Sequence, residues 1–333
     1  MKTAVNNQLV LAGDIGGTKT NIGLFYKGRT GPRLKVMEQF SSPQSPDLET
    51  IIDRFLHSHP FRITAACFGI AGPVVNGRCK TTNLPWDVSE SRLKKRFGWS
   101  CVRLINDLIA TALALEVLPQ RDHLALNAAK PQKGQPVGLI APGTGLGQAF
   151  LIYHNDRCVP VASEGGHADF CISSDADARL WQYLSRQFGH VSLEKILSGA
   201  GLVNIYRWLR DSGRYREPRW LAESLRKTDP AQAITAAARE QKNPLCTATL
   251  NRFVSIFGAA SGNLALTAMT TGGIYLGGGI APKILSELNQ KRFMSAFTNK
   301  GRFKKYLEKI AVRVILNDKA ALMGAASFAL EMT

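Results

Sequence analysis

The chain has 333 residues, 45% of them hydrophobic, and a formal net charge of +17. This length allows a sizeable core and either two domains or one large one. There is no apolar run of membrane-spanning length and no signal-like N-terminal block, so we expect a soluble, cytoplasmic protein without membrane contact. The six cysteines are scattered and form no CxxC pair, which argues against a zinc site or a disulfide framework and favours free thiols.

The positive charge is concentrated in three segments, residues 91–99, 206–227 and 291–309. Such charge is compatible with nucleic-acid binding, or with a solvated basic surface that also attracts anionic nucleotides. No zinc-finger spacing or RNA-binding aromatic signature accompanies it. The first strand begins by about residue 8, which leaves no room for a DNA-binding domain. We therefore expect no nucleic-acid partner.

The first half of the chain predicts alternating strands and helices. Residues 8–40 are typical of three strands joined by a Gly-rich turn and a short turn. The pattern then indicates a helix over 45–58, a buried strand over 63–70, a short helix over 89–98 and a strand over 101–105. The last of these strands leads into a helix over 108–115. This is an α/β arrangement with helices crossing between strands.

The second half begins with the same design. Residues 137–153 predict strand, Gly turn and strand, as residues 9–26 do, and this repetition indicates a duplicated fold with a cleft between its halves. The chain is then mainly helical from about 175 to 271. It ends with a strand, Gly turn and helix over 272–285 and a strand, turn and apolar helix over 312–331.

The turn in "GDIGGTKT" is a candidate phosphate site. The glycines Gly16 and Gly17 let backbone N–H groups approach phosphate oxygens, and Thr18 adds a hydroxyl donor. Asp14 at the strand end can hold Mg²⁺, directly or through water. An ordinary hairpin turn is the alternative. The spacing matches neither a Walker loop nor a Rossmann fingerprint.

Two further glycine turns strengthen this interpretation. "APGTGLGQAF" puts Gly143, Thr144 and Gly145 between two strands, so that a nucleotide could meet donors on both sides. "LGGGIAP" contains the run 277–279, which is compatible with close helix packing or with a surface for adenine or ribose.

Two other polar residues could reach a polyol. Glu164 and His167 in "ASEGGHADF" can accept and donate to vicinal hydroxyls, although a hydrogen-bonded loop pair explains them equally well. Glu194 alone is typical of an acid in the first turn of a helix. Asn106 and Asp107 lie between an apolar strand and an apolar helix, which suits a helix N-cap or ligand-binding residues at a strand end.

Taken together, these motifs resemble the bacterial glucokinases of the hexokinase–actin–chaperone ATPase superfamily, in particular the group common in proteobacteria. The resemblance covers nearly the whole chain. It is carried, in order, by "GDIGGTKT", "GIAGPV", "TNLPW", "INDL", "APGTGLG", "EGGHADF", "HVSLEKILSGAGLVNIY" and "GGIYLGGGIAP".

This resemblance implies ATP-dependent phosphorylation of the glucose 6-hydroxyl, with ATP and Mg²⁺ as cofactors and Asp107 as the catalytic carboxylate. It implies that the glucose hydroxyls are held by Asn106, Asp107, Glu164, His167 and Glu194. The residues implied at the nucleotide are Gly13, Asp14, Ile15, Gly16, Gly17, Thr18, Lys19, Gly143, Thr144, Gly145, Gly277, Gly278 and Gly279. Asp14 would help position Mg²⁺ through water.

Two positions depart from the family pattern. The family usually reads GGTN at the first turn. This chain instead has Lys19 followed by Thr20 and Asn21, as the ROK sugar kinases do, but it lacks the CxCGxxGC zinc motif that ROK proteins usually carry. Leu108 replaces the Phe that often follows the catalytic Asp. Two alternatives stay open: a kinase of another hexose or N-acetylhexosamine, and a sugar-sensing regulator.

The fold that we expect is a duplicated ribonuclease-H-like (actin-like ATPase) fold with sugar and ATP in the cleft between two domains. The smaller domain is residues 1–117 rejoined by a strand and helix in 309–333. The larger domain, with a helical insertion, is residues 118–308. The family resemblance also suggests a homodimer.

Overall fold

The computed structural model describes residues 8–81, 84–155 and 157–333. The first two residues of "TNLPW", Thr82 and Asn83, lie outside this part of the chain. Two compact units are present: Met1–Asp122 with Pro160–Ala162 and Asn317–Thr333, and His123–Val159 with Ser163–Leu316. We call them unit 1 and unit 2 and describe each by itself.

Unit 1 is built on a five-stranded sheet with the order β3-β2-β1-β4-β7. Its strands are β1 (Leu9–Ile15), β2 (Lys19–Lys27), β3 (Pro32–Ser41), β4 (Ile63–Ile70) and β7 (Cys101–Asn106). The first three form an antiparallel meander, and β1, β4 and β7 run parallel. A small hairpin of β5 (Arg78–Lys80) and β6 (Asp87–Ser89) is attached.

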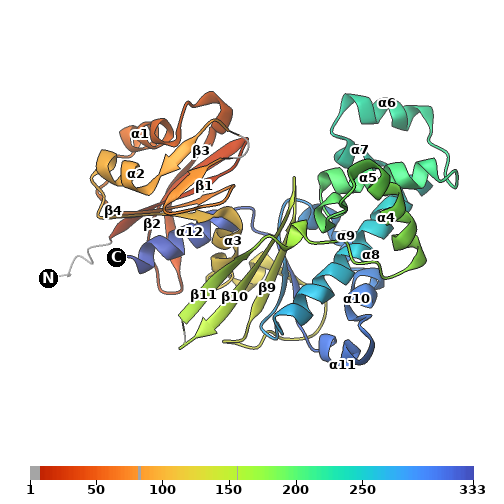
Figure 1. Cartoon of the computed structure of the whole chain (residues 1–333). Helices are drawn as coiled ribbons and strands as arrows, with labels where there is room; N and C mark the ends of the chain where they lie inside the picture. The colour runs from red at the N-terminus through yellow and green to blue at the C-terminus, as the bar shows by residue number, and fades with distance from the viewer. Residues whose placement is uncertain (1–7, 82–83, 156) are drawn as a thin grey trace. The chain divides into compact units, whose positions relative to one another are not determined.

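Helices cover both faces of this sheet (Figure 1). On one face, α1 (Leu48–Ser58) and α2 (Glu90–Phe97) close an apolar cluster that includes Leu11 and Phe68. On the other, α3 (Asp107–Ala114) and α12 (Ala320–Glu331) pack against residues such as Val10 and Ala12. Because successive strand residues alternate between faces, one strand supplies both clusters.

Unit 2 contains a six-stranded sheet with the order β11-β10-β9-β12-β13-β8. Its strands are β8 (His123–Ala125), β9 (Val137–Pro142), β10 (Leu146–His154), β11 (Arg157–Ser163), β12 (Gly273–Leu276) and β13 (Val312–Ile315). As in unit 1, the first strand of the meander, β9, is followed in the sheet by two strands parallel to it, β12 and β13. The repeated strand order extends the internal similarity seen in the sequence from two strands to five.

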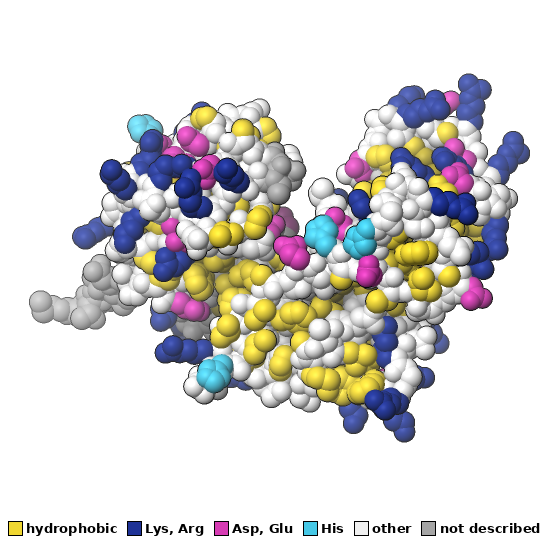
Figure 2. All heavy atoms as spheres, in the orientation of Figure 1, with side chains coloured by type: hydrophobic (Ala, Val, Ile, Leu, Met, Phe, Trp, Pro, Cys, Tyr) yellow, Lys and Arg dark blue, Asp and Glu magenta, His cyan; other side chains and the backbone are white. Residues whose placement is uncertain are grey.

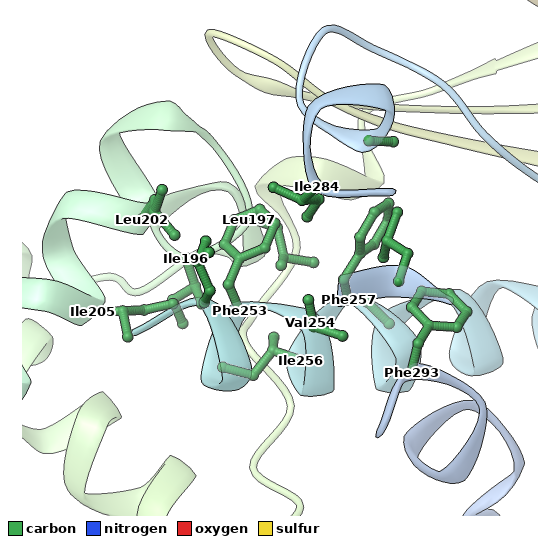
Figure 3. Close-up of a cluster of buried hydrophobic side chains, with 14 of the residues drawn as sticks. Ile196, Leu197, Leu202, Ile205, Phe253, Val254, Ile256, Phe257, Ile284 and Phe293 are labelled. Atoms are coloured by element: carbon green, nitrogen blue, oxygen red, sulfur yellow. The ribbon is translucent and has the colours of Figure 1, made fainter. Parts of the chain in front are cut away.

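The helices of unit 2 pack mainly around α8. They are α4 (Asp175–Phe188), α5 (Gly199–Asp211), α6 (Arg219–Lys227), α7 (Pro230–Arg239), α8 (Pro244–Thr267), α9 (Leu285–Leu288), α10 (Lys291–Thr298) and α11 (Lys304–Leu307). Phe253 and Phe257 of α8 lie among Leu197, Ile284 and Phe293 in one buried cluster (Figure 3). Burial of such side chains contributes about 1.5–3 kcal/mol each, so α8 is the central support of this unit.

One expected boundary is wrong. We expected a strand and a helix after about residue 309 to rejoin the first domain, but β13 pairs with β12 and β8 in the sheet of unit 2. Only the chain from Asn317, including α12, belongs to unit 1. The apolar pattern of β13 shows that it is a buried strand, but it does not show which sheet the strand joins.

The surface carries basic side chains on both units in the face drawn in Figure 2. Several basic side chains of the protein have acidic partners, among them Arg92 with Glu49 and Arg103 with Glu90.

All six cysteines are free, as predicted. Among the described helices, none is both long enough and apolar enough to cross a bilayer.

Candidate active site

Asn106 caps the helix that follows β7. Its side-chain oxygen accepts hydrogen bonds from the backbone N–H of Leu108 at 2.9 Å and of Ile109 at 3.4 Å. Its amide nitrogen donates to the Gly72 carbonyl at 3.3 Å. The cap satisfies N–H groups that have no partner inside the helix. Asn106 is therefore fixed in place, with its N-cap role visible in the structure.

Asp107 is the first residue of α3 and is half-buried. Burial raises the pKa of its carboxyl above the ordinary value, and hydrogen bonds, first of all from the Leu108 N–H at 2.9 Å, oppose that shift. A partly desolvated carboxylate accepts a proton more readily than one in water. This position thus has the chemistry of a general base.

Asp14 belongs to the same group of carboxylates. Its pKa is raised to about 6, chiefly by burial and next by the negative charge of Asp107. A side-chain hydrogen bond from Asn21 at 3.5 Å acts in the opposite direction. Gln39 in turn donates to the Asn21 oxygen at 2.9 Å. Since the charge of Asp107 acts on Asp14, the two carboxylates form one electrostatic unit.

Our sequence reasoning missed Asn21 and Gln39 as supporting residues. Asp14 faces Asn21 across β1 and β2, and Asn21 faces Gln39 across β2 and β3. The row of three polar residues therefore depends on strand register. The polar character of Asp14 in the otherwise apolar strand β1 was a signal, but its partners could be identified only from the pairing.

The first glycine turn is held by Ser42, which directly follows β3. The N–H of Gly16 donates to the Lys19 carbonyl at 3.0 Å, and the Ser42 hydroxyl donates to the Gly16 carbonyl at 2.8 Å. The N–H of Ser42 also donates to the Thr18 carbonyl at 3.1 Å. The Thr18 and Lys19 side chains are exposed. These hydrogen bonds thus fix the backbone of the turn, while the exposed Thr18 and Lys19 side chains remain accessible to a ligand.

Gly13 and Ile15 lie in β1 and pack into the core. A β carbon at Gly13 would lie 2.5 Å from the Phe68 ring, so the glycine is required for packing. The Ile15 side chain is buried in an apolar cluster. Neither residue offers a side chain to a ligand, in contrast to their neighbours at the turn.

In unit 2, Glu194 holds the second glycine turn. Its Oε2 accepts a hydrogen bond from the Leu146 N–H at 2.9 Å, and a β carbon on Gly145 would lie 2.5 Å from the same oxygen. Glu194 belongs to a single 3-10 turn before α5, so it does not start an α-helix. The carboxylate thus has a role that the sequence did not indicate, because its partner is 48 residues away.

The loop with Glu164 and His167 lies beside that turn. A β carbon at Gly166 would lie 2.1 Å from the Leu146 carbonyl, so the loop contacts the start of β10 directly. The side chains of Glu164 and His167 are 87% and 63% exposed, and the carboxylate Oε2 and ring Nε2 are 4.0 Å apart. Unit 2 therefore brings Glu164, His167 and Glu194 to one edge, around Leu146.

The third glycine turn contacts the second one. The N–H of Gly277 donates to the Ile140 carbonyl at 2.9 Å. Gly278 has φ +75°, and a β carbon there would lie 2.4 Å from the Pro142 carbonyl. At Gly279 a β carbon would meet nothing within 4 Å among the described residues. Close packing thus explains two of the three glycines, and the third borders open space.

That space is a cavity of about 1020 Å³ in unit 2. Gly143, Thr144 and Gly279 line it, together with the N-terminus of α5 and the residues of α7. Asn204, Arg207 and Gln232 are lining residues that the sequence did not single out. They lie on amphipathic helices, where an outward polar residue carries no sign that it faces a cavity.

The carboxylates of unit 1 fit Mg²⁺ as hard oxygen donors, because a divalent cation would offset the burial and the charge of Asp107, which raise the pKa of Asp14. The described residues contain no group of three or more His, Cys, Asp or Glu that could hold a metal by themselves. Mg²⁺ usually keeps several waters and binds phosphate oxygens beside one or two carboxylates. Asp14 therefore suits a shared site of this kind.

The chain matches the family model described as glucokinase over residues 11–332. It is 39% identical to a glucokinase from Nostoc punctiforme, covering 96% of this chain and 98% of that protein. A glucokinase from Yersinia pestis is 36% identical, with 96% and 95% covered. A crystal structure of a glucokinase from an Antarctic psychrotroph superposes with a TM-score of 0.88 at 29% identity, covering 97% of this chain and 99% of that chain. The chain belongs to the glucokinase family.

Proposed function

We propose that this protein transfers the γ-phosphoryl group of ATP to the 6-hydroxyl of glucose, giving glucose 6-phosphate. The observation that carries this proposal is the half-buried carboxylate of Asp107 at the start of α3, electrostatically coupled to Asp14. The curated glucokinases that match nearly the whole chain support glucose as the acceptor.

Asp107 is the proposed general base. A sugar hydroxyl keeps its proton at neutral pH, so a carboxylate within hydrogen-bond reach must orient it and take the proton as the O–P bond forms. The partial burial of Asp107 makes it a stronger base than an exposed aspartate. The N-terminus of α3 favours negative charge on Asp107, which opposes the effect of burial on its pKa.

ATP is proposed to lie in the cavity of unit 2. Gly143 and Thr144 border this cavity beside Gly199, the first residue of α5. The N–H groups and dipole at a helix N-terminus favour phosphate, which suits the nucleotide's phosphates at this end. The exposed Arg207 supplies a positive charge on the same wall. The remaining cavity, bordered by Gly279, has room for adenine and ribose.

Mg²⁺ would neutralise phosphate charge and is proposed to be held by Asp14, through water. The exposed turn at Gly17, Thr18 and Lys19 offers further donors for phosphate oxygens. Since phosphoryl transfer requires mainly placement and charge neutralisation, these groups complement the base.

The residues that we propose to bind the glucose hydroxyls are Asn106, Asp107, Glu164, His167 and Glu194. Carboxylates and an imidazole suit vicinal hydroxyls because each can accept or donate a hydrogen bond. We also propose the duplicated ribonuclease-H-like fold for the two units, supported by their shared strand order, and a homodimer, suggested by family resemblance.

A coupled assay with Mg²⁺-ATP tests the proposal. Glucose should be phosphorylated with a higher kcat/KM than N-acetylglucosamine, mannose or fructose. A preference for one of those sugars would reassign the acceptor within the kinase class. Glucose binding without phosphoryl transfer to any of them would instead support a sugar sensor. Asp107→Asn serves as the inactive control, with circular dichroism to show that it is folded.

A further inference from the structure

The helix that carries Asp107 is short and needs external support. α3 spans eight residues, Asp107–Ala114. Isolated helices of this length are marginal in water, so tertiary packing must fix its position. The hydrogen bond from the Thr111 hydroxyl to the Asp107 carbonyl at 3.0 Å and the Asn106 cap act only within the first turn.

α12 contacts the backbone of α3 at a glycine. A β carbon at Gly324 would lie 1.8 Å from the Ala110 carbonyl oxygen and 2.8 Å from the Ala114 nitrogen. These are backbone atoms, which cannot rotate away as a side-chain end can. The two helices can thus cross at this distance only because residue 324 has no side chain.

Strand β4 also contacts α3 closely, again at a glycine. A β carbon at Gly69 would lie 2.9 Å from the Ala110 β carbon and 3.7 Å from the Asp107 α carbon. Ala110 is fully buried and belongs to the apolar cluster that includes Leu322 and Ala325 of α12. α3 is therefore held at Ala110 by close contacts with Gly69 of β4 and Gly324 of α12. We call these two contacts the clamp.

We propose that Gly324 is a positioning residue for the reaction. It sets the distance of α12 from α3 and so fixes where Asp107 presents its carboxylate to the sugar. This inference rests on the proposed function of Asp107. A larger residue at 324 must displace α3, and a misplacement of about 1 Å can reduce a rate by about 100-fold.

The decisive variant is Gly324→Ala, compared with Leu322→Ala. Leu322 is buried on the same helix, and its truncation leaves a cavity without pushing on α3. We expect Gly324→Ala to lower kcat by about tenfold or more. Its Kd for ATP, bound in unit 2, should stay within about twofold of the wild-type value. Leu322→Ala should lower the thermal midpoint at least as much but keep kcat within about threefold, measured well below both midpoints.

A folded Gly324→Ala enzyme with wild-type kcat would overturn the proposal, as would equal losses of kcat in both variants. If Gly324→Ala does not fold, a comparison of kcat between Ala110→Gly and Ala112→Gly tests the proposal instead. Both remove one buried methyl group from α3 at the same cost in helix propensity. We then expect the larger loss of kcat in Ala110→Gly, and equal losses would contradict the clamp. Absence of glucose phosphorylation by the wild-type protein would refute the proposed function instead.

Discussion

Two pairs of candidate site residues, one in each unit, lie in different surroundings. In unit 1, Asp14 and Asp107 are half-buried and their pKa values are raised by desolvation. In unit 2, the side chains of Glu164 and His167 are 87% and 63% exposed. The first pair is held by packing, whereas the second lies at the surface of its unit. This contrast supports the proposed roles of Asp107 in proton transfer and of Glu164 and His167 in sugar recognition.

The largest expected effect is that of Asp107→Ala. Removal of a general base typically costs 10²–10⁴-fold, and we expect about 1,000-fold or more in kcat. The measurement is a coupled assay at saturating glucose and ATP, with circular dichroism as the control for folding. Turnover within about tenfold of the wild-type rate would contradict the proposed role of Asp107 and the contrast between the two units.

A change at Glu164 should act on binding. Glu164→Ala deletes a charged acceptor, and such hydrogen bonds contribute about 1.5–3 kcal/mol, so the KM for glucose should rise about 10- to 100-fold with kcat nearly unchanged. Asp169→Ala is the matched control, since Asp169 is equally exposed and its carboxylate lies 2.9 Å from His190. An unchanged KM for glucose in Glu164→Ala, or equal rises in both variants, would contradict the recognition role.

Asp14→Asn should stabilise the protein at high pH. The folded-state pKa of about 6 lies above the ordinary 3.8, so the folded protein binds this proton more tightly. Its stabilising contribution is therefore complete below about pH 4 and is lost as the pH rises through about 6. A neutral amide avoids the buried charge.

Urea denaturation at pH 4.5 and pH 8 measures this effect. The free energy of unfolding of Asp14→Asn should exceed that of the wild type by about 1–3 kcal/mol at pH 8, with a smaller difference at pH 4.5. A difference that grows toward low pH would have the wrong sign for a desolvated carboxylate. The same variant should need more Mg²⁺ for half-maximal activity.

The smallest effect is expected for Glu194→Gln. The amide oxygen can still accept from the Leu146 N–H, so only the charge is lost. Because Glu194 supports the second glycine turn as well as the proposed sugar contact, the KM values for glucose and ATP should both rise, by about three- to tenfold. A rise in the KM for glucose alone would show that the charge of Glu194 acts on sugar binding and not on the glycine turn, as we expect for Glu164.

Sequence patterns predicted most elements but not their long-range partners. The strands at β1, β2 and β3 and the helix α3 follow from local apolar spacing and glycine punctuation. The strands β8 and β11 were missed, and β13 was assigned to the wrong domain. A short strand between turns carries too little local signal, and its sheet is decided by pairing with residues far away.

For the candidate site, too, the sequence predicted residues with a local signal but not their long-range contacts. Residue type alone identified Asp14, Asp107 and the glycine turns as candidates for this chemistry. It did not identify Ser42, which braces the first turn, or the contact of Glu194 with Leu146. Those contacts join residues 26 and 48 positions apart, and no local pattern determines them.

The place of α12 in unit 1 has a consequence for synthesis on the ribosome. The face of β1 with Val10 and Ala12 is synthesised long before α12, which covers it and is made only after the sheet of unit 2. Although N-terminal domains usually fold first, unit 2 can complete its sheet while unit 1 still exposes this apolar face. A nascent chain paused before Ala320 is thus expected to be prone to aggregation and to need a chaperone at unit 1.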